Sequence, residues 1–324
     1  MTVRLILSML VSFALVYFIT PVIIPHLRKL KFGQIVREEG PETHKAKSGT
    51  PTMGGVAILA GVMLSYIFFV EKSLDSVVFI VVTLGFGSVG FIDDYIKVVK
   101  KRNLGLRAYQ KLIGQFVFAL ALTVYQYQFG VLKDAIYLPL FKQVFNLGWF
   151  YLPFAFVVVV GIVNSVNLTD GLDGLASGVT IIYFSCYFLI LLVLKDTIGI
   201  DNIYFLLTGA LLGALGAFLC YNKFPAKIFM GDVGSLAIGG AVASLSILTG
   251  TFILFPVVGL VYLAETMSVV LQVLYYKKTG RRIFLMSPLH HHFEQKGLKE
   301  TQVVKGFLKA SLAFGLLALI LVLI

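Results

Sequence analysis

Apolar stretches of about twenty residues follow one another along almost the whole chain, with short polar segments between them. A helix of about 20 residues crosses the hydrocarbon core of a bilayer, so this pattern predicts membrane-spanning helices. The boundary between the two predicted spans within residues 235–276 is the least distinct, because this stretch is nearly continuously apolar and contains several glycines. We expect about ten spans: 3–25, 53–70, 77–96, 107–129, 151–169, 174–194, 202–221, 235–250, 252–276 and 303–323.

Composition supports the same class of protein. Hydrophobic residues make up 58% of the 324 residues, charged residues only 13%, and the mean hydropathy is +0.92. Ordinary soluble domains carry about 25% charged residues. No polar stretch is long enough for a separate soluble domain. We therefore expect an all-α, polytopic integral membrane protein with a single transmembrane domain over residues 1–324.

The positive charges predict how the chain is oriented in the membrane. If successive loops alternate between the two sides, 22 of the 27 lysines and arginines fall on one side. Basic loops stay in the cytoplasm, which places both termini outside. The net charge of the chain is +11, but membrane spans separate the lysines and arginines, which form no basic domain. Nucleic acid is therefore not an expected partner. The remaining five basic residues are Arg4, Lys72, Lys133, Lys142 and Lys195.

Five aspartates stand at the ends of predicted spans, all on the basic side. The chain has only 16 acidic residues, and a carboxylate costs about 2.5 to 3.5 kcal/mol at the centre of a membrane helix. Groups kept at this boundary need a cation, a partner or water. Carboxylate oxygens bind hard divalent cations, and lysines attract phosphate, so the mixture predicts a site for a metal and a phosphorylated substrate. The five are Asp93, Asp94, Asp170, Asp173 and Asp232.

Three short motifs carry these aspartates: FIDDY at 91–95, NSVNLTDGLDG at 164–174 and FMGDVGS at 229–235. In the second motif polar residues recur every three positions, which suits a helix that the glycines then interrupt. Each motif also has a simpler interpretation. The first could be a polar helix end, the second an Asn/Gly-rich turn and the third a helix cap supplied by Asp232.

A run of three histidines lies in the segment PLHHHFE at 288–294, which we predict to be a loop. Adjacent imidazoles rarely reach one ion together, so phosphate binding or a structural contact is expected there rather than a transition metal. Glu265, within the ninth span, is expected either to pair inside the bundle or to face water.

Together these motifs, with KSGTPTMGG at 47–55, resemble the polyprenyl-phosphate N-acetylhexosamine-1-phosphate transferase superfamily, and most closely its phospho-N-acetylmuramoyl-pentapeptide transferases. The resemblance covers nearly the whole chain. It implies transfer of phospho-N-acetylmuramoyl-pentapeptide from its UDP carrier to undecaprenyl phosphate, giving lipid I and UMP, in the first membrane step of peptidoglycan synthesis. It also implies Mg²⁺ as cofactor and a bacterial inner membrane location. The active site would face the cytoplasm among membrane lipids, and a homodimer is left open.

The resemblance further implies roles for individual residues. Asp232 is expected to bind Mg²⁺, and Asp93 and Asp94 to form a catalytic pair in which Asp93 is the candidate base. The uridine pocket would be formed by Gly171, Leu172, Asp173, Asn222 and Phe229. The other expected catalytic residues are Lys111, Asn167, Asp170, His290 and His291. The other expected substrate-binding residues are Lys45, Thr50, Asn164, Ser235, Gln272 and His292.

Three alternatives remain open from the sequence. One is a transferase of the same class that uses UDP-N-acetylglucosamine. Another is an ion-coupled transporter, although transporters place their acids near the bilayer midplane and often contain inverted repeats, and neither feature is evident here. The last is a scaffold that presents a basic face to anionic lipid, which would need no aspartates.

Overall fold

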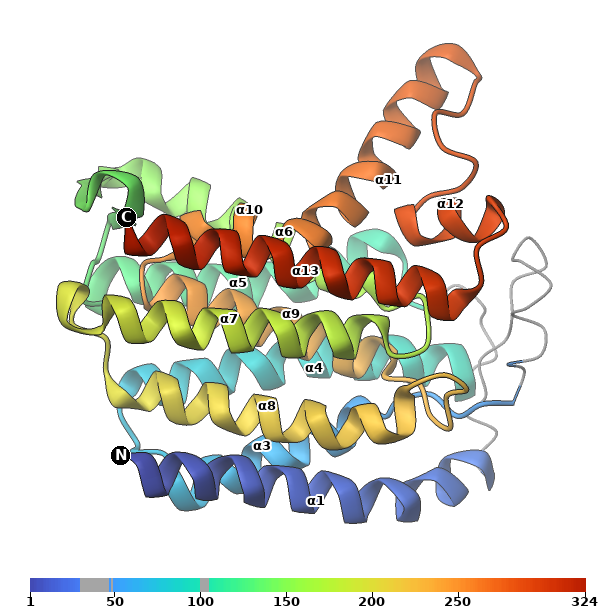
Figure 1. Ribbon diagram of the computed structural model, residues 1–324, viewed down its shortest axis with the longest axis horizontal. Coiled ribbons are helices and arrows are strands. Elements are labelled where there is room, and N and C mark those ends of the chain that lie inside the picture. Colours follow the sequence, from blue (N-terminus) through green and yellow to red (C-terminus); the bar gives the residue numbers. More distant parts are fainter. Residues whose placement is uncertain (30–46, 48, 100–104) are drawn as a thin grey trace.

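A computed structural model describes residues 1–29, 47, 49–99 and 105–324, and it is almost entirely helical (Figure 1). The helices are α1 Thr2–Lys29, α3 Gly55–Phe69, α4 Leu74–Val99, α5 Ala108–Phe129, α6 Tyr151–Thr169, α7 Leu175–Ile198, α8 Asn202–Asn222, α9 Gly231–Leu248, α10 Phe255–Val258, α11 Leu260–Thr279, α12 Leu289–Gln295 and α13 Glu300–Leu323. Two strands, β1 Ala135–Leu138 and β2 Gln143–Asn146, and three short 3-10 helices, η1 Pro139–Phe141, η2 Gly148–Phe150 and η3 Phe252–Leu254, complete the described elements.

Helix lengths identify a polytopic membrane protein. Among the described residues, eight helices are long and apolar enough to cross a membrane, namely α1, α4 to α9 and α13. Helix α3 is apolar but has only 15 residues, or about 22 Å, which is less than the roughly 30 Å of a hydrocarbon core. A bent pair, α10 and α11, is a ninth candidate. All ten predicted segments are therefore helical, but they do not make ten complete spans by length.

The span predicted over 252–276 is not one continuous helix. The chain forms η3 and the short α10, breaks at Gly259, and continues as α11 after a bend of 82°. Pro256 at the start of α10 and Gly259 at its end weaken the backbone hydrogen bonding that would keep a helix straight. Helix α10 packs on α13, whereas α11 turns away from the parallel helices (Figure 1).

Helix α9 forms the centre of the bundle. Every residue from 233 to 248 is buried, with α3, α4 and α6 packed around the helix. A close crossing with α4 is possible because residue 90 is glycine. A Cβ atom at Gly90 would overlap the carbonyl oxygen of Asp232. This crossing places the C-terminal end of α4 beside the first turn of α9.

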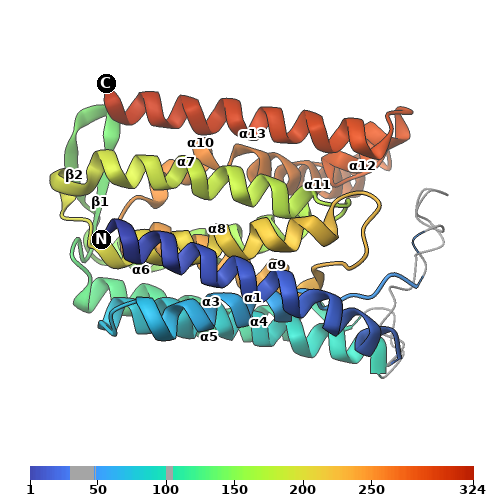
Figure 2. The same cartoon turned by 60° about the horizontal axis from the view of Figure 1, so that its bottom comes forward.

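The two ends of the bundle differ in content. Both chain termini and the β-hairpin lie at one end, whereas α12, the end of α4 and the start of α9 lie at the other (Figures 1 and 2). Between α5 and α6, β1 and β2 pair as an antiparallel hairpin, with Ala135 paired to Asn146. Trp149, in η2 beside the hairpin, is 77% exposed.

Candidate active site

Three aspartates meet where α4 ends and α9 begins. Asp93, Asp94 and Asp232 each offer a carboxylate oxygen, and these oxygens lie within 4.8 Å of one another. Asp232 lies in the first turn of α9, but the N-cap is Met230 and no side chain caps the helix. Its carboxylate contacts other side chains instead, so capping does not account for Asp232. We call Asp93, Asp94 and Asp232 the aspartate cluster.

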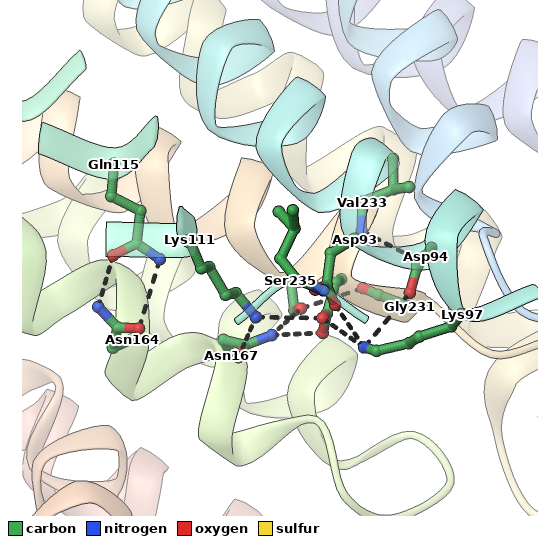
Figure 3. Close-up of polar contacts among 12 residues, drawn as sticks. Asp93, Asp94, Lys97, Lys111, Gln115, Asn164, Asn167, Gly231, Val233 and Ser235 are labelled. Carbon is green, nitrogen blue, oxygen red and sulfur yellow. Dashed lines mark hydrogen bonds and ion pairs between the residues drawn. The ribbon is translucent and has the colours of Figure 1, made fainter. Parts of the chain in front are cut away.

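A lysine supplies positive charge to all three carboxylates. The Lys97 ammonium lies 2.5 Å from Asp93 Oδ2, 2.7 Å from Asp232 Oδ2 and 3.9 Å from Asp94 Oδ1 (Figure 3). It reaches them because it follows Asp93 by four residues, one helical turn. Carboxylates this close repel one another, and the ammonium offsets part of that repulsion.

A second group of side chains approaches Asp232 from α5 and α6. The Lys111 ammonium lies 3.1 Å from Asp232 Oδ2, and the Asn167 amide donates to Asp232 Oδ1 at 2.9 Å (Figure 3). The same amide nitrogen lies 2.8 Å from Ser235 Oγ. Asp232 is thus contacted by side chains from three other helices, α4, α5 and α6.

Backbone amides fix the other two carboxylates. Asp93 Oδ1 accepts from Leu106 N at 2.7 Å, at the entrance to α5. Asp94 Oδ2 accepts from Val233 N at 3.1 Å, in the first turn of α9. The two acids of the FIDDY motif therefore attach the end of α4 to two neighbouring segments. These bonds leave the other oxygen of each carboxylate facing Lys97.

Asn164 lies one turn before Asn167 on α6 but does not contact the aspartates in the structure. Its side chain donates to Gln115 Oε1 at 2.8 Å and accepts from Gln115 Nε2 at 3.4 Å, which joins α6 to α5 (Figure 3). The polar stripe predicted on this helix is confirmed, with Asn164 holding α5 and Asn167 holding Asp232.

The turn after α6 adds a further acid. Helix α6 ends at Thr169, so the predicted interruption of the helix by the glycines is confirmed. Burial, followed by the charges of Asp232 and Asp173, raises the pKa of Asp170 to about 7. Asp170 is therefore close enough for the charges of both Asp232 and Asp173 to act on its carboxyl group.

Asp173 belongs to a separate group of charges, which we call the Lys47 cluster. The Lys47 ammonium lies 2.7 Å from Asp173 Oδ1 and 2.5 Å from Glu300 Oε1. The backbone N of Asp173 donates to the same Glu300 oxygen at 2.8 Å. Asp173 Oδ2 accepts from Ala226 N at 2.8 Å, which joins the turn after α6 to the segment after α8.

The remaining residues predicted for a uridine pocket lie around these two segments. Asn222 is buried; it accepts from Ser177 Oγ at 2.8 Å and donates to the Ile228 carbonyl at 3.1 Å. The backbone N of Phe229 donates to Pro51 O at 2.8 Å. Leu172 is buried as well. The structure thus brings the turn at 170–174 and the segment 223–230 together.

The prediction of a loop over 288–294 is wrong, because residues 289–295 form the helix α12 directly after Pro288. His290 is buried, and its Nδ1 lies 3.1 Å from Glu265 Oε2. Of the two expectations for Glu265, pairing inside the bundle is therefore confirmed. The His290 ring lies against Gly171, where a Cβ would overlap it. This contact joins α12 to the turn that carries Asp170.

The other two histidines and Gln272 hold structure nearby. His291 Nδ1 lies 2.8 Å from Glu294 Oε2, within α12. His292 Nδ1 accepts from Leu285 N at 3.2 Å, and Gln272 Oε1 accepts from Phe284 N at 2.9 Å. Gln272 and His292 thus hold the segment between α11 and α12.

Two predicted residues remain, Lys45 and Thr50. Lys45 lies outside the described residues. Thr50 is described, and its backbone N donates to the Lys47 carbonyl at 3.1 Å. No hydrogen bond from its side chain to another described residue is found.

Sequence reasoning missed Lys97, Gln115, Lys47 and Glu300. Lys97 could have been found, because a lysine four residues after an aspartate is its neighbour on a helix. Gln115 follows Lys111 by four residues, so it too lies on the helix face that carries a predicted residue. Lys47 and Glu300 are 253 positions apart, and no local pattern links them.

The donor set of the aspartate cluster suits a hard divalent cation. Three carboxylates converge, and these are the ligands that Mg²⁺ prefers. A positive group, the Lys97 ammonium, already lies among them and shows that the position favours positive charge.

Comparison with known proteins agrees with this chemistry. Residues 76–250 match the family model of glycosyl transferase family 4, and residues 47–59 match signature 1 of the phospho-N-acetylmuramoyl-pentapeptide-transferases. A protein with that name from Caldanaerobacter subterraneus is 49% identical over 94% of this chain and 94% of its own length. The protein of the same name from Halalkalibacterium halodurans is 45% identical over 98% of this chain and 97% of its own length. The protein of the same name from Bacillus subtilis is 46% identical over 96% of this chain and 96% of its own length. The chain therefore belongs to the phospho-N-acetylmuramoyl-pentapeptide-transferase family, within glycosyl transferase family 4.

Proposed function

We propose that this protein transfers phospho-N-acetylmuramoyl-pentapeptide from its UDP carrier to undecaprenyl phosphate, producing lipid I and UMP. The observation that carries the proposal is the aspartate cluster with Lys97 and Lys111 at one end of the membrane-spanning helices. One substrate is a water-soluble nucleotide and the other is a lipid phosphate. A site for both has to lie where the membrane meets water, which is where helix ends collect.

Mg²⁺ would be held by Asp232, assisted by Asp93 and Asp94. When bound, the ion supplies charge neutralisation for the two phosphates of the nucleotide. Lys97 and Lys111 then have a second role besides balancing the carboxylates, because each can donate to phosphate oxygens. Asn167 contacts both Asp232 and Ser235, so it fixes the orientation of the Asp232 carboxylate.

In the reaction, an oxygen of the lipid phosphate forms a bond to the sugar-linked phosphorus of the donor. The bond from that phosphorus to the bridging oxygen breaks, and UMP leaves with its electron pair. Asp93 is the candidate base that removes a proton from the lipid phosphate before attack. We expect Asp170, which is near both charged groups, to contact the donor between its phosphates and its nucleoside. His290 and His291 are expected to approach from α12.

The nucleoside is expected at the turn 170–174 and the segment 223–230, with the Phe229 ring against uracil. We further propose that residues 1–324 act as one catalytic domain in a bacterial inner membrane. The end that carries the aspartate cluster would face the cytoplasm, as the distribution of basic residues predicts.

The test is UMP release by purified protein supplied with UDP-N-acetylmuramoyl-pentapeptide, undecaprenyl phosphate and Mg²⁺. We expect release only when all three are present. Side-by-side reactions with UDP-N-acetylglucosamine distinguish the related transferase, because equal or faster turnover of that donor would overturn the substrate assignment. Uptake of substrate into liposomes without UMP release would instead favour a transporter.

A further inference from the structure

The Lys47 cluster joins segments that are far apart in the sequence. Glu300 is in the first turn of α13, Asp173 in the turn before α7, and Lys47 in the segment before α3. Through Asp173 Oδ2 the same group also holds Ala226, after α8. Four segments thus converge on one ammonium and two carboxylates.

Glu300 makes two of the contacts in this group with one oxygen. Its Oε1 accepts from the Lys47 ammonium at 2.5 Å and from the Asp173 backbone N at 2.8 Å. The Glu300 side chain is only 7% exposed and that of Asp173 only 3%. An acid in a first helical turn often serves only the helix dipole. Here the carboxylate is buried in a hydrogen-bonded group, and its removal would leave Lys47 with one partner fewer.

The position of the group connects it to the nucleotide. Gly171 and Leu172 directly precede Asp173, and Asn222 and Phe229 flank the segment that Asp173 Oδ2 holds. Glu300 itself lies outside the residues that match the family model and the signature, whereas Lys47 is the first residue of the signature match. An acidic group also suits the neutral nucleoside better than the phosphates, which are expected beside Lys97 and Lys111.

We propose that Glu300 is a positioning residue for the nucleoside half of the donor. It acts through Lys47 and the Asp173 backbone, whose placement sets the distance between the turn 170–174 and the segment 223–230. This inference rests on the proposed function, since it assumes a uridine nucleotide at these two segments. Glu300 is not expected to contact the lipid phosphate or the reacting phosphorus.

The test compares the Glu300→Ala and Glu300→Gln variants with the unmodified protein. Truncation to Ala removes both hydrogen bonds to Oε1, so we expect the KM for the nucleotide donor to rise about tenfold. The kcat and the KM for undecaprenyl phosphate should stay within about twofold, because the aspartate cluster is untouched. Glutamine retains a carbonyl acceptor of the same length, and we expect it to limit the rise in KM to about threefold.

Direct binding of UMP, measured by calorimetry without lipid, gives a second readout that a merely structural role would not change. The dissociation constant should rise by the same factors as the KM for the donor. A matched control is Glu71→Gln, because Glu71 is an exposed acid that pairs with Arg4 at the opposite end of the bundle. We expect this variant to bind UMP normally.

The outcomes separate the two proposals. Unmodified protein that binds UMP but releases none from the donor contradicts the proposed function, while UMP binding by the variants still tests Glu300. Unchanged UMP affinity in both folded variants, or a loss confined to kcat, overturns the positioning role. Absence of UMP binding by the unmodified protein overturns it as well. Should Glu300→Ala lose its fold in detergent, the threefold effect expected of Glu300→Gln decides.

Discussion

Helix α4 carries aspartates at both of its ends, and the two ends use them differently. Near its start, Asp75 accepts from the Tyr125 hydroxyl at 2.7 Å and from the Tyr204 hydroxyl at 2.6 Å. One carboxylate is thus shared by two neutral donors from α5 and α8. Near its end, Asp93 and Asp94 meet Asp232 and are balanced by Lys97.

The difference shows which acids hold the fold and which are placed for chemistry. A single carboxylate with neutral donors joins helices at little electrostatic cost. Three carboxylates within 4.8 Å repel one another, and a fold gains little from collecting them. Such groups are typical of sites that receive a cation or an anionic substrate with its counterion. We therefore expect Asp75 to matter for stability and Asp232 for turnover.

The largest expected effect separates these roles directly. Asp232→Asn should lower the kcat for UMP release by about 10³-fold or more, because it removes a charge from the position proposed to bind Mg²⁺. The variant should remain folded in detergent, since the asparagine amide oxygen can still accept from Lys97 and Lys111. Turnover within tenfold of the unmodified protein would contradict the assignment of Asp232 as a metal ligand.

A second test concerns the helix crossing that builds the aspartate cluster. Gly90→Ala would push a methyl group into the Asp232 carbonyl, so we expect a loss of about 1 to 3 kcal/mol of stability together with lower activity. Its control is Gly161→Ala, on α6, where a Cβ would meet no atom within 4 Å. Because alanine favours a helix over glycine, the control should match or slightly exceed the original stability. Thermal unfolding in detergent measures both, and equal melting temperatures for the two variants would argue against a tight crossing.

The smallest expected effect is at the opposite end of α4. Asp75→Asn keeps one acceptor oxygen and loses the other, which leaves the hydroxyl of Tyr125 or Tyr204 without its carboxylate acceptor. We expect about 1 to 2 kcal/mol of destabilisation. The KM and kcat of the folded variant should be unchanged, as followed by UMP release. A large loss of kcat without a change in melting temperature would remove the distinction between the two ends.

Much of the helical content and part of the site could be predicted from the sequence, because both have local causes. Apolar stretches set the positions of the helices. The FIDDY and FMGDVGS motifs placed Asp93, Asp94 and Asp232 at helix ends that share a side, and the structure brings the three together. The glycines after Asp170 and Asp173 correctly indicated the end of α6.

What could not be predicted depends on contacts between distant residues. The glycines within 235–276 left the boundary between the last spans open. The 82° bend between α10 and α11 goes with packing of α10 on α13 and of α11 on α6, which are distant in the sequence. The short helix at 289–295 is too brief to show an amphipathic period, so the histidines were expected in a loop. Glu300 was not singled out from the sequence, because its partners at 47 and 173 are distant along the chain.

The location of Trp149 affects how ligand binding can be observed by spectroscopy. It is the chain's single tryptophan and precedes α6, whose 19 residues extend about 28 Å toward the end that carries Asn167. Its fluorescence therefore reports the polarity around the hairpin end, and nucleotide or metal binding near Asp232 should leave the emission maximum unchanged. An optical signal from the site will need an introduced fluorophore or a labelled nucleotide.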